Sequence, residues 1–112
     1  MIRLRDDLSW EQIVELGLTG FGTPYLTEVE VSQLLDQIRG RPLIVQSMEA
    51  MLRGRDADIP LTQYSILGLE PESVWGACDD PQTMRTLVEE KMISSRSEGP
   101  NMLFQIWLRD IS

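Results

Sequence analysis

Adjacent acidic residues are the side chains in this sequence with the clearest potential for chemistry. They occur as Asp6-Asp7, Asp79-Asp80 and Glu89-Glu90, and paired carboxylates can hold a divalent cation or act as an acid and a base. Adjacent residues on a helix do not point at one place, however, and no third ligand follows at a suitable spacing. We therefore interpret these pairs as solvated charge and expect no metal site.

Nucleophilic and cofactor chemistry lack the residues that they usually need. The chain has no histidine, the commonest general base and metal ligand, and its one cysteine is Cys78. A single cysteine permits neither an intrachain disulfide nor a cysteine-based zinc site, and we expect Cys78 to be buried or half-buried. A glycine-rich phosphate loop and a serine nucleophile motif are also absent from the sequence. The sequence predicts a protein that is not an enzyme and that binds no cofactor.

Composition predicts one acidic domain. The chain has 112 residues, of which 42% are hydrophobic, and its net charge is −8, so a single domain over residues 1–112 can bury an ordinary core. No apolar run approaches the roughly 18 residues of a membrane span, and the charged N-terminus does not resemble a signal peptide, which predicts a cytoplasmic protein without membrane contact. Because DNA affinity depends largely on neutralising phosphates, contact with DNA would be confined to a local basic face.

The strongest structural pattern lies between residues 80 and 110. Asp80 fits a helix N-cap and Pro81 a first helical residue, and an apolar stripe at the helical period follows: Met84, Leu87, Val88 and Met92. Residues 92–97 are rich in serine, residues 98–101 have the composition of a turn, and residues 102–109 alternate like a strand. The pattern predicts a helix at 81–92 that runs directly into a β-hairpin. In its last strand Met102, Phe104, Ile106 and Leu108 would point to one side, and Leu103, Gln105, Trp107 and Arg109 to the other.

Helices are also expected upstream. Capping boxes at Ser9–Gln12 and Thr27–Glu30 predict two helices that end near Gly17 and Gly40. We expect a third helix at 42–53, a fourth at 60–68, a short helical segment near 69–75, and an arm or short strand at 1–7. The buried side of the third helix would consist of Ile44, Val45, Met48, Met51 and Leu52.

The helix with a polar hairpin after it resembles the end of a winged helix-turn-helix domain, in the pattern of MarR-like and PadR-like regulators. The resemblance covers residues 42–110 and implies a mainly α fold with a C-terminal β-hairpin. The helix at 81–92 would then be the recognition helix, and the hairpin would be the wing. The connection at 69–79 is longer than this family usually has. Residues 1–40 would be an added helical pair, which in such regulators commonly serves dimerisation.

The resemblance also implies a set of DNA-contacting residues. Groups near the start of a recognition helix reach base edges and phosphates, and a wing reaches the neighbouring groove. The candidates are Gln82, Thr83, Arg85 and Thr86 on the helix and Ser95 and Arg96 on the wing. The alternative is a solvated helix face and an ordinary exposed hairpin, because the acidic residues on and before this helix repel phosphate.

Two further features of the sequence are candidates for binding a phosphate or a partner. Arg39-Gly40-Arg41 and Arg53-Gly54-Arg55 bracket the third expected helix; each could present a cationic pair to a phosphate, although helix C-capping explains both more simply. Trp75 and Trp107 are either anchors for a partner or core residues.

Two functions follow from this sequence. One is a small winged-helix transcriptional regulator that binds double-stranded DNA as a homodimer formed through residues 1–40. The other is an acidic protein-binding module, such as a phage-type inhibitor or anti-defence protein, that occupies a basic nucleic-acid-binding surface of its target. The resemblance favours the regulator, whereas the net charge of −8 favours the protein-binding module.

Overall fold

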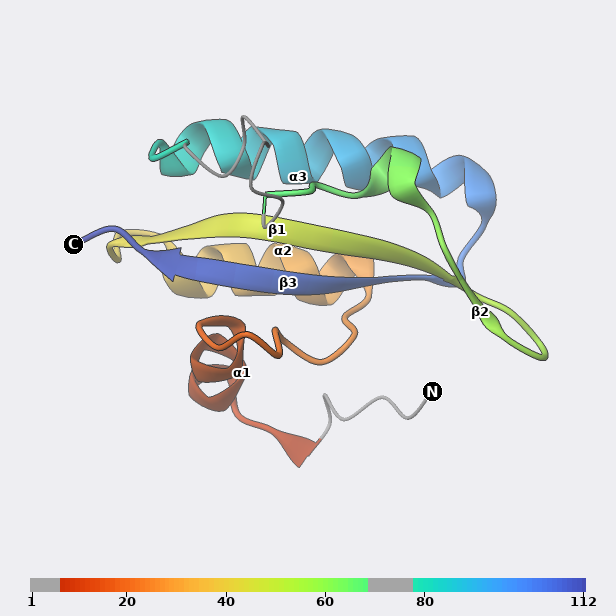
Figure 1. Cartoon of the computed structure of the whole chain (residues 1–112), viewed down its shortest axis with the longest axis horizontal. Helices are drawn as coiled ribbons and strands as arrows, with labels where there is room; N and C mark the ends of the chain where they lie inside the picture. The colour runs from red at the N-terminus through yellow and green to blue at the C-terminus, as the bar shows by residue number, and fades with distance from the viewer. Residues whose placement is uncertain (1–6, 69–77) are drawn as a thin grey trace.

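The computed structural model describes residues 7–68 and 78–112, which form an α+β fold. In this part of the chain a three-stranded antiparallel sheet of order β2-β1-β3 is accompanied by three α-helices (Figure 1). The helices are α1 (Trp10–Gly17), α2 (Glu28–Ile38) and α3 (Pro81–Ser95), with short 3-10 turns η2 (Thr62–Tyr64) and η4 (Arg96–Glu98). The strands are β1 (Leu43–Arg53), β2 (Asp58–Pro60) and β3 (Met102–Asp110).

Local sequence signals determine where the helices begin. The hydroxyl groups of Ser9 and Thr27 accept hydrogen bonds from the backbone three residues on, and Gln12 and Glu30 complete both capping boxes. Gly40, just beyond the end of α2, has a φ of +77°, a conformation that other residues rarely adopt. The expected starts of α1 and α2, and the end of α2 near Gly40, are therefore confirmed.

Helix α3 begins as the sequence predicts, with Asp80 as N-cap and Pro81 as the first helical residue. Its inner side buries Met84, Val88 and Met92 against β1. The helix is longer than expected and continues to Ser95. Residues 96–98 then form η4 rather than a strand, so no strand stands before the turn at Gly99.

The sheet has two unlike faces. Met102, Phe104, Ile106 and Leu108 of β3 share one face, as the alternation predicts, and they are buried there. Helix α2 lies behind β1 and β3 in Figure 1, and α3 runs beside β1. The other side of β1 and β3, which we call the open face, carries the half-buried residues Glu49, Gln105 and Trp107 together with the buried residues Ser47, Met51 and Leu103.

The winged-helix prediction is wrong. The last strand does not fold back on residues 92–97; it pairs over its whole length with β1, from Leu43 opposite Asp110 to Leu52 opposite Met102. The molecule is therefore not mainly α with a C-terminal hairpin, since strands form its centre. The wing was inferred from short-range turn chemistry, whereas the residues that pair with β3 lie fifty or more positions earlier in the chain.

The helix expected at 42–53 is also wrong, because these residues form β1. Gln46 is an extra residue between Val45, opposite Leu108, and Ser47, opposite Trp107, and so forms a β-bulge. The bulge breaks the period of two, and core-facing positions then run Leu43, Val45, Met48, Ala50 and Leu52. With Ile44 also buried, the apolar residues take on a spacing that resembles a helix.

The helix expected at 60–68 is replaced by β2, η2 and an extended segment. Pro60 ends an edge strand, where its missing N–H costs no sheet hydrogen bond. Ile66 then pairs with Met48 through two backbone hydrogen bonds of 2.8 and 3.0 Å. The prediction failed because the propensities of residues 60–68 alone do not indicate that Ile66 pairs with Met48.

The helices before β1 belong to the same core as the sheet. Ile13 and Val14 of α1 and Leu34 and Leu35 of α2 are buried together with Phe104 in one apolar cluster. Dimerisation through residues 1–40 stays a prediction. The expected arm at 1–7 falls mostly outside the described residues, as do the short helical segment at 69–75 and Trp75.

Candidate functional site

The first turns of α3 bring together four of the six residues expected to contact DNA. Gln82 donates from Nε2 to the Thr86 hydroxyl at 3.3 Å, and the Thr83 hydroxyl donates to the carboxylate of Asp80. That hydroxyl, followed by the backbone N–H groups of Gln82 and Thr83, lowers the pKa of Asp80 below its usual value. The start of the helix is thus already capped by a carboxylate of the same chain.

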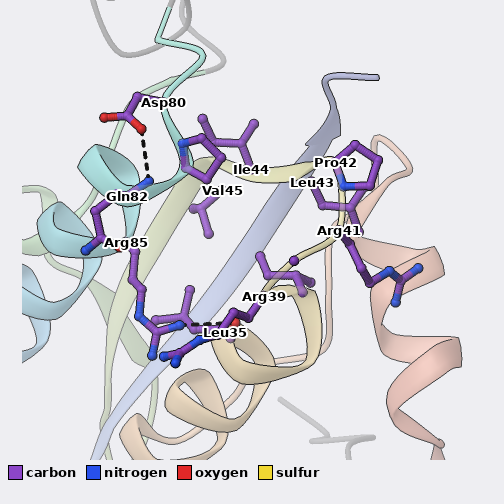
Figure 2. Close-up of a pocket in the computed structure, with 13 residues that line it drawn as sticks. Leu35, Arg39, Arg41, Pro42, Leu43, Ile44, Val45, Asp80, Gln82 and Arg85 are labelled. Carbon is purple, nitrogen blue, oxygen red and sulfur yellow. Dashed lines mark hydrogen bonds between the residues drawn. The ribbon is translucent and has the colours of Figure 1, made fainter.

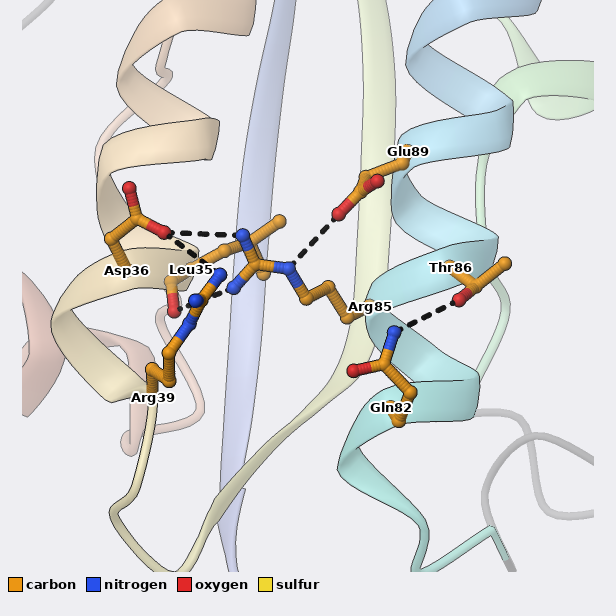
Figure 3. Close-up of polar contacts among 7 residues, drawn as sticks. All are labelled: Leu35, Asp36, Arg39, Gln82, Arg85, Thr86 and Glu89. Carbon is orange, nitrogen blue, oxygen red and sulfur yellow. Dashed lines mark hydrogen bonds and ion pairs between the residues drawn. The ribbon is translucent and has the colours of Figure 1, made fainter.

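Arg85 is engaged between α2 and α3 (Figure 3). Its guanidinium contacts Asp36 at 3.1 Å and Glu89 at 2.9 Å, and it donates to the carbonyl oxygen of Leu35 at 3.3 Å. Only 22% of the side chain is exposed. Arg39 also contacts Asp36, at 3.4 Å, so one carboxylate serves two arginines. Arg85 therefore links two helices, a role that the one-dimensional pattern of α3 did not reveal.

The other two predicted contact residues lie at the far end of α3. Ser95 is buried and donates to the carbonyl oxygen of Met92 at 2.7 Å. Arg96 forms an ion pair with Glu28 of α2 at 2.8 Å. At about 1.5 Å of rise per residue, Thr86 and Ser95 are separated by roughly 14 Å along the helix. The six residues do not form one cluster.

A pocket of about 860 Å³ opens where the end of α2, the start of β1 and the start of α3 meet (Figure 2). Apolar groups such as Leu35, Ile38 and Leu43 form part of its wall, with Arg39, Arg41 and Arg85 around them. Each of these arginines already contacts a carboxylate, and Arg41 reaches Glu11 at 3.4 Å. The pocket thus combines apolar surface with guanidinium groups whose charges are compensated.

The two Arg-Gly-Arg segments differ in their structures. Gly40 follows helix α2, as helix C-capping requires, whereas Gly54 follows strand β1 and not a helix. The interpretation of Gly54 as a helix C-cap is therefore wrong. A side chain at Gly54 would strike the carbonyl oxygen of Ala57 in the turn before β2. Glycine is needed there for close approach of the backbone.

Within residues 7–68 and 78–112, no group of three or more carboxylate, cysteine or histidine side chains is placed to hold a metal ion. Cys78 is half-buried, and its thiol contacts the carbonyl oxygen of Asp80 at 3.9 Å. None of the described helices has the length and apolar character needed to cross a membrane.

The open face carries a polar row that the sequence did not reveal. The Tyr25 hydroxyl donates to Oε1 of Glu49 at 3.3 Å, and Gln105 lies opposite Glu49 on the neighbouring strand. Gln105 itself donates from Nε2 to the carbonyl oxygens of Phe21 and Thr23. The indole of Trp107 donates to the carbonyl oxygen of Gly20 at 3.0 Å. Glu49 was missed because its strand was interpreted as a helix, whereas the alternation of β3 correctly placed Gln105 and Trp107 on the side opposite Phe104 and Ile106.

The pKa of Tyr25 is expected to depend on its contact with Glu49. Burial, followed by the charge of Glu49 and its hydrogen bond, raises the pKa of Tyr25 from 10.0 to about 12. The neutral tyrosine is thus favoured in the folded state, so the free energy of unfolding should fall as pH rises from 10.0 towards 12. Ultraviolet titration of tyrosinate in a Tyr64→Phe background measures the Tyr25 pKa alone. Glu49→Gln should lower it, though not to 10.0 because burial remains; an unchanged value would contradict the pairing.

Comparison of the chain with models of protein families, with curated proteins and with solved structures finds no match.

Proposed function

We propose that the protein is an acidic interaction module that binds a basic surface of a partner protein, such as a nucleic-acid-binding groove. The observation that carries this proposal is that most of the described basic residues already form ion pairs within the chain. Residues 7–68 and 78–112 contain eight basic residues. Five of them are in ion pairs with carboxylates of the same chain: Arg39, Arg41, Arg85, Arg96 and Arg109.

The same part of the chain has fifteen acidic residues, so a large negative excess remains after these pairs are formed. A surface of this sign repels phosphate and attracts basic proteins, and it raises association rates with them at low salt. DNA binding would require Arg85 and Arg96 to give up contacts with Asp36, Glu89 and Glu28. The winged-helix arrangement that favoured DNA binding is also absent. Both considerations favour a basic protein as the partner.

The test compares two ligands at two salt concentrations: mixed-sequence duplex DNA and an arginine-rich peptide from a nucleic-acid-binding protein. We expect no binding to DNA even at low salt, and binding to the peptide that weakens as salt increases. A scrambled chain of identical composition is the matched control, because it has the same net charge without the folded surface. We expect it to bind the peptide at least tenfold more weakly.

Salt-dependent binding to DNA that is lost in Arg85→Ala and Arg96→Ala variants would overturn the proposal. Equal affinity of the folded and scrambled chains for the peptide would also overturn it, because it would show that charge acts without a defined surface.

A further inference from the structure

The open face has a hollow of about 330 Å³ beside Glu49. Trp107 and Leu67 contribute apolar walls, and Leu67 is 47% exposed. Hydroxyl-bearing residues from β1, from η2 and from the segment after η2 also line it: Ser47, Thr62 and Ser65. The hollow therefore combines aromatic and aliphatic side chains with a carboxylate and hydroxyl groups.

Sheet register places the carboxylate and the indole together. Glu49 lies opposite Gln105, and Trp107 lies opposite Ser47, so Glu49 and Trp107 are diagonal neighbours on one face. Residues 20–22 hold Trp107 in place: its indole N–H donates to the Gly20 carbonyl oxygen, and its ring lies against Gly22. A side chain at Gly22 would come within 2.8 Å of the indole ring. The indole is thus fixed in position before any ligand arrives.

Glu49 retains capacity for a cation. Its Oε1 atom accepts from Tyr25, and within residues 7–68 and 78–112 the carboxylate forms no ion pair. This distinguishes it from Asp36, which serves two arginines. Glu49 is half-buried, and a carboxylate in such surroundings binds a donor more strongly than one in open water.

We propose that this hollow receives an arginine side chain of the basic partner. The guanidinium would form a bidentate contact with Glu49, and its plane would stack on Trp107, the best aromatic surface for a cation. The aliphatic stem would lie against Leu67. The excess of negative charge on the chain selects a cationic occupant over a second, equally acidic copy. This inference rests on the proposed function and specifies which surface performs it.

The test is an NMR titration of the full chain with N-acetyl-arginine methylamide, with the citrulline analogue as a neutral control of the same shape. We expect saturable shifts of the Trp107 indole N–H and the Glu49 amide with the arginine compound. Citrulline should bind about tenfold more weakly or not at all. Equal effects of the two compounds, or shifts confined to residues outside the open face, would overturn the inference.

Variants distinguish the site from general electrostatics. Glu49→Gln should weaken binding about tenfold, whereas Glu90→Gln, an identical change at an exposed position of α3, should alter it less than twofold. The spectrum of Glu49→Gln shows whether its fold is retained. Tyr25→Phe removes the hydroxyl that competes for Glu49 and should leave binding intact or improve it. Equal losses in Glu49→Gln and Glu90→Gln would overturn the arginine site.

The arginine-rich peptide separates this inference from the proposed function. If the folded chain binds the peptide but the shifts map to α1 or α2, the function stands and the hollow is the wrong surface. If arginine methylamide binds in the hollow but the peptide binds no better to the folded than to the scrambled chain, the proposed function fails and only the side-chain site remains.

Discussion

Phe104→Ala is expected to reduce the free energy of unfolding by about 3–5 kcal/mol, the usual cost of removing a buried phenylalanine ring. Phe104 is 1% exposed at the centre of β3 and belongs to the cluster that joins the helices to the sheet. Its backbone forms two hydrogen bonds of 2.7 Å with Leu26, which ties the segment before α2 to the edge of the sheet. The lost ring would leave a cavity that this tightly connected region cannot close.

Phe21→Ala provides the matched control, because it makes the same chemical change at a side chain that is 83% exposed. Its expected cost is below about 0.5 kcal/mol. Urea unfolding of both variants, followed by circular dichroism, measures the difference. A cost below about 1 kcal/mol for Phe104→Ala, or similar costs for the two variants, would show that β3 is not the centre of the core.

The parts of the fold that sequence predicted are those specified by near neighbours. Capping boxes at Ser9 and Thr27 and the Asp80-Pro81 start all lie within four residues of the backbone groups that they satisfy. The alternation in β3 likewise reports directly which residues share a side of the strand. These features required no knowledge of distant contacts, so they were recovered with the correct residues.

The central strand, β1, was missed because a bulge and a pairing with a distant segment alter its pattern of apolar residues. The bulge at Gln46 shifts the core-facing positions, and the pairing of Met48 with Ile66 helps to bury residues that an ordinary edge would expose. Because β1 was not recognised as a strand, residues 92–97 before the turn were the only segment with which the last strand was expected to pair. One misassigned element therefore produced both the false helix and the false wing.

The candidate site was only partly predictable for the same reason. Gln82 and Thr86 were correctly placed together on one side of α3, but the contacts of Arg85 with Leu35 and Asp36 depend on how α2 and α3 pack. The row from Tyr25 to Glu49 depends on the register of the sheet. The net charge can be counted from the sequence, but only the fold shows which arginines form ion pairs.

Gly68→Ala is expected to destabilise the protein by about 3 kcal/mol, because the new methyl group would overlap the backbone of β1. A Cβ atom at Gly68 would collide with the carbonyl oxygen of Gln46 and lie 2.8 Å from its carbonyl carbon. Gln46 is the bulged residue, and the nearby pairing of Ile66 with Met48 holds the two segments together. Relief of the collision therefore requires movement of backbone rather than of a flexible side chain.

Gly20→Ala is the control for this substitution, since a Cβ atom there would meet nothing within 4 Å and Gly20 does not have a positive φ. It should change the free energy of unfolding by no more than about 1 kcal/mol. Hydrogen exchange locates the damage: in Gly68→Ala the amides of Met48 and Ile66 should lose protection before those of Leu103 and Phe104, because the strain acts on the edge of β1 opposite β3. Stability equal to that of Gly20→Ala would mean that the segment after η2 does not lie against the bulge.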